Sequence, residues 1–225
     1  MEKKIETKGI RYLGSKSKII PLIVDVVEGL NIDDKSIIDV FTGTTRVAQA
    51  FKSVGYKVTT SDLAWASTAY SHAFICNDGD VKHLQTYIDE LNELEGVEGW
   101  LTKNYCNGSA IKRDGSTIAI QVWKPKNGKK ADAIRDHINN LQLEAWEKNY
   151  LITSLIFALD KVDNTVGLQQ AYLKGWKSPR VDKDLKLQLL PSFEGHAGRH
   201  ICGDALKIDY PEASVAYLDP PYTSA

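Results

Sequence analysis

Apolar positions repeat first with helical spacing and then in short runs typical of strands. Residues 18–30 carry Ile, Val and Leu three and four positions apart, which predicts an amphipathic helix. The run 36–41 is β-branched and ends in a turn of Thr and Gly, as a buried strand does. A helical pattern follows over 47–54, and residues 56–61 alternate like a second strand. This order predicts a βαβ unit and therefore a parallel sheet.

The rest of the chain combines long helical patterns with polar segments. Residues 80–98 predict a helix with an acidic face, and residues 131–162 predict one long helix whose apolar stripe is wide enough for burial on more than one side. Between them, residues 105–130 are polar apart from a strand-like stretch at 117–123. Two further short strands are predicted near the end of the chain, at 200–202 and 215–218.

Composition excludes several classes of protein. The 225 residues predict one domain or two small ones, and 28 basic against 29 acidic residues exclude a histone-like protein and an acidic disordered tail. No apolar run approaches the roughly 18 residues of a membrane span. The three cysteines are widely spaced, which disfavours a disulfide framework or a zinc site and fits the reducing cytoplasm. We expect neither a metal nor a membrane partner.

The balanced net charge hides an asymmetry along the chain. Residues 101–190 hold 15 Lys and Arg against 9 Asp and Glu, whereas the remaining residues hold 13 against 20. A basic middle flanked by acidic ends is typical of an insert that faces a polyanion. Chance clustering on a solvated surface is the alternative interpretation.

The tetrapeptide Asp219-Pro220-Pro221-Tyr222 directly follows the last predicted strand. Its prolines stiffen the turn and remove backbone donors, which leaves the Pro220 carbonyl free to accept. A carboxylate, a carbonyl and an aromatic face suit a planar amine such as N6 of adenine, because two acceptors can bind its hydrogens while Tyr222 stacks on a flipped base. An ordinary Pro-rich turn is the alternative.

The two strands of the βαβ unit end in residues that suit a nucleotide. Gly43 follows the first strand and permits a close approach of backbone to ligand, and the next helix offers free N–H groups. Asp62 ends the second strand, where such folds place an acid on ribose hydroxyls. A plain turn glycine and a helix cap are the alternatives.

Four motifs in this order resemble the DNA adenine-N6 methyltransferases of the alpha motif order. They are Arg11-Tyr12-Leu13-Gly14-Ser15-Lys16, Asp39-x-Phe41-x-Gly43, Gly203-Asp204 and Asp219-Pro220-Pro221-Tyr222. The stretch 164–167 followed by 172–174 is similar to the family's middle region, so the resemblance spans nearly the whole chain. It implies a Rossmann-like, doubly wound α/β sheet of the S-adenosylmethionine-dependent type. It also implies a catalytic domain over 1–75 and 195–225, with a helical, basic target-recognition insert over 76–194.

The resemblance implies a role for each matching residue. Tyr12 and Lys16 would hold the methionine end of S-adenosylmethionine, Asp62 its ribose and Asp204 its adenine, while Asp219 would touch both cofactor and substrate. The cofactor-binding set is Tyr12, Lys16, Asp39, Phe41, Gly43, Asp62, Asp204 and Asp219. The catalytic set is Asp219, Pro220, Pro221 and Tyr222. Basic residues expected on DNA are Arg113, Lys124, Lys126, Lys129, Lys130, Lys174 and Lys177.

The sequence departs from the family pattern in two ways. Thr45 stands where the family often has a second small residue, and its hydroxyl is expected to cap the following helix. Strands that the family places after the tetrapeptide have no counterpart before Ala225. We therefore expect an incomplete sheet with an exposed edge and a complementing C-terminal chain as a partner.

The expected function is methylation of adenine N6 in duplex DNA, in the cytoplasm, within a restriction-modification system or a phage. The expected partners are double-stranded DNA and, functionally, a restriction endonuclease. A cytosine-N4 methyltransferase is one alternative, although those enzymes more often begin the tetrapeptide with Ser. Methylation of RNA or of a protein amide is disfavoured by the N-terminal motif. The last alternative is a non-catalytic or split-enzyme fragment that binds DNA or cofactor and needs a partner chain.

Overall fold

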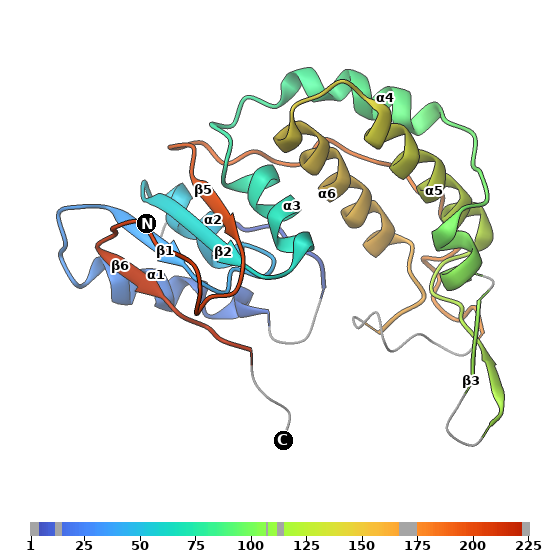
Figure 1. The fold of residues 1–225 in the computed structure, drawn as a ribbon, viewed down its shortest axis with the longest axis horizontal. Coiled ribbons are helices and arrows are strands. Elements are labelled where there is room, and N and C mark those ends of the chain that lie inside the picture. The colour runs from blue at the N-terminus through green and yellow to red at the C-terminus, as the bar shows by residue number, and fades with distance from the viewer. Residues whose placement is uncertain (1–4, 12–14, 107, 112–114, 167–174, 222–225) are drawn as a thin grey trace.

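The protein is an α/β structure built on a four-stranded parallel sheet (Figure 1). The computed structural model describes residues 5–11, 15–106, 108–111, 115–166 and 175–221. The strand order is β5-β2-β1-β6. The first strand, β1, is therefore an inner strand, and β5 and β6 form the two opposite edges of the sheet. The strands are β1 (Ser36–Asp39), β2 (Lys57–Asp62), β5 (Arg199–Cys202) and β6 (Val215–Tyr217). All four predicted strands are confirmed, with ends shifted by one or two residues.

Three helices cover the face of the sheet that carries its apolar side chains. Ile37 is in register with Val58 on one side and Val215 on the other, so the three side chains share a face. These residues join the core together with α1, α2 and α3. The helices are α1 (Ile20–Glu28), preceded by the 3₁₀ turn η1 (Lys16–Lys18), α2 (Arg46–Ser53) and α3 (Trp65–Phe74). The first two correspond to the predicted helices.

Helix α3 is an element that the apolar pattern does not reveal. It is buried through small and polar side chains, including Ser67, Thr68 and Ser71, because it packs between the sheet and α6. A helix covered on both sides shows no contrast between a wet and a dry face, and apolar periodicity depends on that contrast. Two hydroxyls of α3 instead bond to the sheet: Ser71 to Thr60 and Thr68 to His200, both at 3.0 Å.

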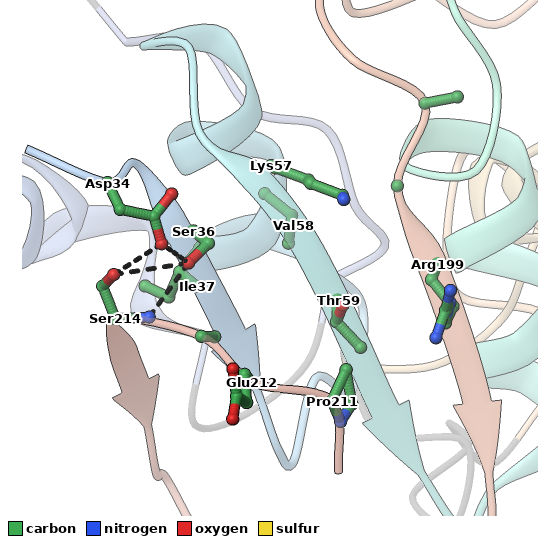
Figure 2. A pocket seen from close by; sticks show the side chains of 13 residues that line it. Asp34, Ser36, Ile37, Lys57, Val58, Thr59, Arg199, Pro211, Glu212 and Ser214 are labelled. Atoms are coloured by element: carbon green, nitrogen blue, oxygen red, sulfur yellow. Dashed lines mark hydrogen bonds between the residues drawn. The ribbon is translucent and has the colours of Figure 1, made fainter.

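The opposite face is crossed by residues 203–214, which connect β5 to β6 through a turn and without a helix. Tyr210 from this segment reaches Ser61 of β2, with 3.4 Å between the hydroxyls. At the amino ends of the strands this face has a hollow of about 690 Å³, lined mainly by polar and charged residues (Figure 2). On its rim, Asp34 accepts from the Ser214 hydroxyl at 2.6 Å, which fastens the start of β6 to β1.

Residues 76–194 form a mainly helical region with a small hairpin. Its elements are η2 (Lys82–Leu84), α4 (Gln85–Glu93), the π-helix η3 (Thr102–Cys106), β3 (Ser109–Ile111), β4 (Thr117–Ala119), α5 (Pro125–Asn140) and α6 (Ala145–Lys161). The predicted helix over 80–98 is confirmed in part, since the 3₁₀ turn η2 and α4 together cover only 82–93. Of the strand-like stretch at 117–123, only Thr117–Ala119 forms a strand, which pairs antiparallel with β3.

The prediction of one helix over 131–162 is wrong, because two antiparallel helices share that stretch. Leu141 and Glu144 both have extended backbones, so the chain leaves α5 and enters α6 through a short connection. Glu144 is the N-cap of α6, and its N–H donates to the Glu147 carboxylate at 2.8 Å in a capping box. The apolar stripe is continuous across the break because both helices bury residues in one core.

The sheet and the helical region share that core. Helix α3 packs along α6, and one cluster of buried residues runs from α1 to Leu190 (Figure 1). The parallel strands all lie within 1–75 and 195–225, and α4 to α6 lie within 76–194. None of the helices in the described ranges is both long and apolar enough to cross a membrane.

Candidate functional site

The predicted site residues gather around one cavity of about 660 Å³ at the carboxyl ends of the parallel strands. Each strand supplies residues directly after its last paired position, since parallel strands all end at the same edge. Eight of the predicted residues line it: Lys16, Phe41, Gly43, Asp62, Asp204, Asp219, Pro220 and Pro221. The hollow in Figure 2 lies at the opposite ends of the strands and contains none of them.

Asp62 organises the turns after β1 and β2. Its Oδ2 accepts from the Gly43 N–H at 2.9 Å, and its Oδ1 accepts from the Ala64 N–H at 2.9 Å. Gly43 has a φ of +52°, and a Cβ built on it would meet no atom within 4 Å, so the cavity side of this turn is open. Each carboxylate oxygen keeps a second lone pair, so Asp62 can still accept from a ligand hydroxyl.

Asp39, the last residue of β1, has a buried carboxyl group at the carboxyl end of the sheet. Its Oδ2 accepts from the Thr42 hydroxyl at 2.9 Å, and its Oδ1 has no hydrogen-bond partner among the described residues. Burial raises the pKa of Asp39 to about 7, with further contributions from the charges of Asp62 and Asp219. Three carboxyl groups therefore act on one another at this edge, which makes it favourable for a positively charged ligand group.

Lys16 and Asp219 join the two ends of the chain at the cavity. The Lys16 Nζ lies 2.6 Å from the Asp219 Oδ2, and both side chains are about one-fifth exposed, at 18% and 22%. The Lys16 ammonium carries three N–H donors, and it pairs with Asp219 through this contact. Asp219 directly precedes Pro220 and Pro221, whose rings restrict the backbone of this turn.

Two leucines complete the cavity and were not among the predicted site residues. Leu63 follows Asp62 directly, and Leu206 lies two residues after Asp204, whose Oδ1 accepts from the Leu206 N–H at 3.1 Å. Their side chains are 71% and 95% exposed, unusually high values for leucine. Leu63 directly follows the end of β2 and Leu206 lies four residues after the end of β5, and this closeness to strand ends is the signal in the sequence that could have identified them.

The expected role of Thr45 as a helix cap is wrong. Thr45 does occupy the N-cap position of α2, but its φ of +61° turns the side chain away from the first N–H groups and no capping bond forms. Its hydroxyl instead accepts from the Gln49 side chain at 3.0 Å. The Thr45 side chain therefore stabilises the turn through its bond to Gln49 and does not accept from the first N–H groups of α2.

Four of the six lysines predicted to bind DNA are engaged within the protein. Lys124 pairs with Asp182, and Lys126 pairs with Asp184 at 2.6 Å. Lys129 lies 3.9 Å from Glu98, and Lys130 donates to backbone carbonyls at the end of α4, including Asn92 at 2.7 Å. Lys177 is exposed. The remaining predicted residues, Tyr12, Arg113, Lys174 and Tyr222, lie outside the described residues.

Asn164 and Thr165, at the start of the middle stretch, are buried at a junction of several segments. The Asn164 side chain donates to the carbonyls of Gln121 and Gly175, both at 3.0 Å. The neighbouring Asp163 pairs with Arg11 at 3.2 Å and with Arg180 at 2.9 Å. The N-terminal motif is thereby tied to the helical region, a contact that only the fold reveals.

The amino-acid sequence of the chain is similar to those of known methyltransferases. The chain is 29% identical over 229 residues to the type II methyltransferase M.NlaIII of Neisseria lactamica, covering 96% of this chain and 65% of that protein. It is 30% identical to the modification methylase LlaI of Lactococcus lactis subsp. lactis and 28% identical to the modification methylase StsI of Streptococcus sanguinis. In those pairs the match covers 95% and 96% of this chain, but only 36% and 34% of the relative.

The chain therefore spans about two thirds of the first relative and about one third of the other two. The profile of one protein family matches nearly all of it, over residues 12–225. That match includes the Lys16 and Asp219 motifs, which the fold brings together at the cavity. The chain belongs to the D12 class N6 adenine-specific DNA methyltransferase family.

Proposed function

We propose that the protein transfers a methyl group from S-adenosylmethionine to N6 of an adenine that has been flipped out of duplex DNA. The observation that carries the proposal is the ion pair between Lys16 and Asp219 at the cavity formed by the four strand ends. Two of the relatives are modification methylases, which favours a role in restriction and modification.

The residues at the cavity fit S-adenosylmethionine by their chemistry. Lys16 offers a cation for the carboxylate of the methionine end, and Asp62 offers acceptors for the ribose hydroxyls. Leu63 and Leu206 provide exposed apolar surface for the adenine ring, beside Asp204. The carboxylates of Asp62 and Asp219 at the cavity favour a sulfonium over a neutral sulfur. When bound, this cosubstrate supplies an activated methyl group.

Asp219 and Pro220 would hold the nucleophile. The lone pair of the adenine amine is delocalised into the ring, so the nitrogen is a weak nucleophile. Two acceptors, the Asp219 carboxylate and the Pro220 carbonyl, would bind its two hydrogens and favour a tetrahedral nitrogen with a localised lone pair. The Asp219 charge would also stabilise the positive charge that develops on nitrogen, and the surplus proton would leave to water.

Lys16 would orient Asp219 for this task. The ion pair fixes the carboxylate at the cavity wall, so its oxygens are held in a defined direction. Positioning is a large part of catalysis in a displacement that needs three atoms in line. Lys16 would thus serve both the cosubstrate and the amine, which explains why two motifs from opposite ends of the chain meet here.

The test is a product analysis. The protein is incubated with S-adenosylmethionine and DNA of mixed sequence, and the DNA is digested and analysed as nucleosides by mass spectrometry. We expect N6-methyladenine, and none with Asp219→Ala, while that variant still binds DNA. N4-methylcytosine as the product would show that the cytosine alternative is correct. Equal loss of DNA binding and methylation in Asp219→Ala would assign the turn a structural role.

A further inference from the structure

We propose that Trp100 and Tyr105 form a second DNA-contact site, where an unpaired base stacks on the exposed rings away from the methyl-transfer cavity. The inference rests on the proposed function, because it takes DNA as the ligand. Extrusion of an adenine leaves neighbouring bases without a stacking partner, and an aromatic surface can replace that partner.

Three aromatic rings form a ladder from the core of the helical region to its surface. Trp123 is buried, and its indole N–H donates to the Leu159 carbonyl at 3.0 Å. The Tyr105 ring lies 6.0 Å from Trp123, and the Trp100 ring lies 5.4 Å from Tyr105, between centroids. The exposed fraction rises along the ladder from 7% through 36% to 67%. The Trp100 and Tyr105 rings are thus connected to the core through Trp123 and are exposed to solvent.

The backbone under the outer rings is rigidly held by α5. The carboxylate of Asp132 accepts from the N–H groups of Gly99, Leu101 and Thr102 at 2.9 to 3.0 Å, which satisfies the helical turn that starts at Trp100. Tyr105 lies in the π-helix η3, an uncommon conformation that is frequent at functional sites. A surface that is ordered before binding loses little conformational entropy when a ligand stacks on it.

Close packing also fixes η3 against α5. A Cβ built on Gly128 would lie 2.3 Å from the Cys106 sulfur, so the two elements meet at a distance that only glycine allows. Asn104 adds a bond from its side chain to the Trp100 carbonyl at 2.7 Å. The backbone that carries Trp100 and Tyr105 is therefore held by its packing on α5 and by the Asn104 bond. Because these contacts do not involve the exposed rings, truncating one ring should leave the fold intact.

A cation beside the two outer rings suits a nucleic acid as the ligand. Lys103 is exposed within η3, between the two aromatic residues in sequence. Glu98, the acidic residue nearest to Trp100 along the chain, lies 3.9 Å from Lys129. The region 101–190 also has an excess of basic residues. A cation beside stacked aromatic rings is the combination that proteins use to bind single strands and extruded bases.

The test compares two mixed-sequence duplexes, one fully paired and one with a single-base bulge, in binding titrations at several salt concentrations. We expect the protein to prefer the bulged duplex. Trp100→Ala should weaken binding to it about ten-fold without changing the salt dependence, whereas Trp100→Phe should stay within about two-fold of the unmodified protein. Lys103→Ala should instead reduce the slope of log affinity against log salt by about one unit.

Circular dichroism and sedimentation velocity accompany the titrations. Unchanged affinity of a folded Trp100→Ala variant for the bulged duplex would overturn the inference. A change in oligomeric state without a change in DNA affinity would also overturn it and assign the rings to a protein interface. Absence of DNA binding and of methylation in the unmodified protein would instead contradict the proposed function. Methylation with an unaffected Trp100→Ala variant would contradict this inference alone.

Discussion

At the scale of single residues, the ion pair between Lys16 and Asp219 is the contact on which the proposed chemistry depends. Its two partners are far apart in sequence and lie at the same cavity. Lys16→Met should weaken binding of S-adenosylmethionine by about ten-fold or more, because the cosubstrate carboxylate loses a charge-assisted hydrogen bond. Isothermal titration calorimetry measures this. Lys18→Met, a change of an exposed lysine in the same turn, is the matched control and should bind normally.

Asp39 gives the protein a pH dependence of stability. Burial raises its folded-state pKa to about 7 from an ordinary value of 3.8. The folded state therefore holds the proton more tightly, so this stabilising contribution is complete below about pH 4 and is lost as the pH rises through 7. Urea unfolding at pH 5 and pH 8 should show a smaller loss of stability in Asp39→Asn than in the unmodified protein. Equal losses in both proteins would mean that the carboxyl does not titrate in this range.

At the scale of elements, the break between α5 and α6 is stabilised by a local signal. Glu144 and Glu147 form the capping box that starts α6. Glu144→Ala should lower the free energy of unfolding by about 1 kcal/mol, because N–H groups of the first turn lose their partner. Glu144→Ser keeps an acceptor at the cap and should be close to the unmodified protein in chemical denaturation. A matching loss in Glu144→Ser would show that the capping bond is not the cause.

The elements also show what a sequence pattern can and cannot predict. The strands could be predicted because they are short β-branched runs, and their polar ends gave most of the cavity residues. Helix α3 could not, because burial on both sides removes its amphipathic contrast. The break at residues 141–144 was hidden by an apolar stripe that both flanking helices share. The Lys16 to Asp219 contact depends on sheet topology, and no local pattern carries that information.

At the scale of the whole molecule, lysines of the basic region can exchange their aspartate partners for DNA phosphates. Lys124 and Lys126 are paired with Asp182 and Asp184, whose side chains are 72% and 89% exposed. Exposed pairs contribute little stability, so phosphates can replace these aspartates. Lys124→Ala/Lys126→Ala should lower DNA affinity and flatten its salt dependence, while Asp182→Asn/Asp184→Asn should raise DNA affinity. Titrations of both double variants decide this, and a loss of stability without an effect on DNA affinity would show that the lysines only tether the segment.

The strand order has a consequence for how the chain acquires its structure during synthesis. Thr60 of β2 bonds to Arg199 of β5 across 139 residues, so the ribosome must make all of the helical region before the sheet can gain its third strand. At about 5–20 residues per second that interval is roughly 7–28 s. Pairings between distant segments form slowly because chain entropy must be lost first. For that time β1 and β2 expose edges that favour aggregation, and early helix formation in residues 76–194 shortens the search that closes the sheet.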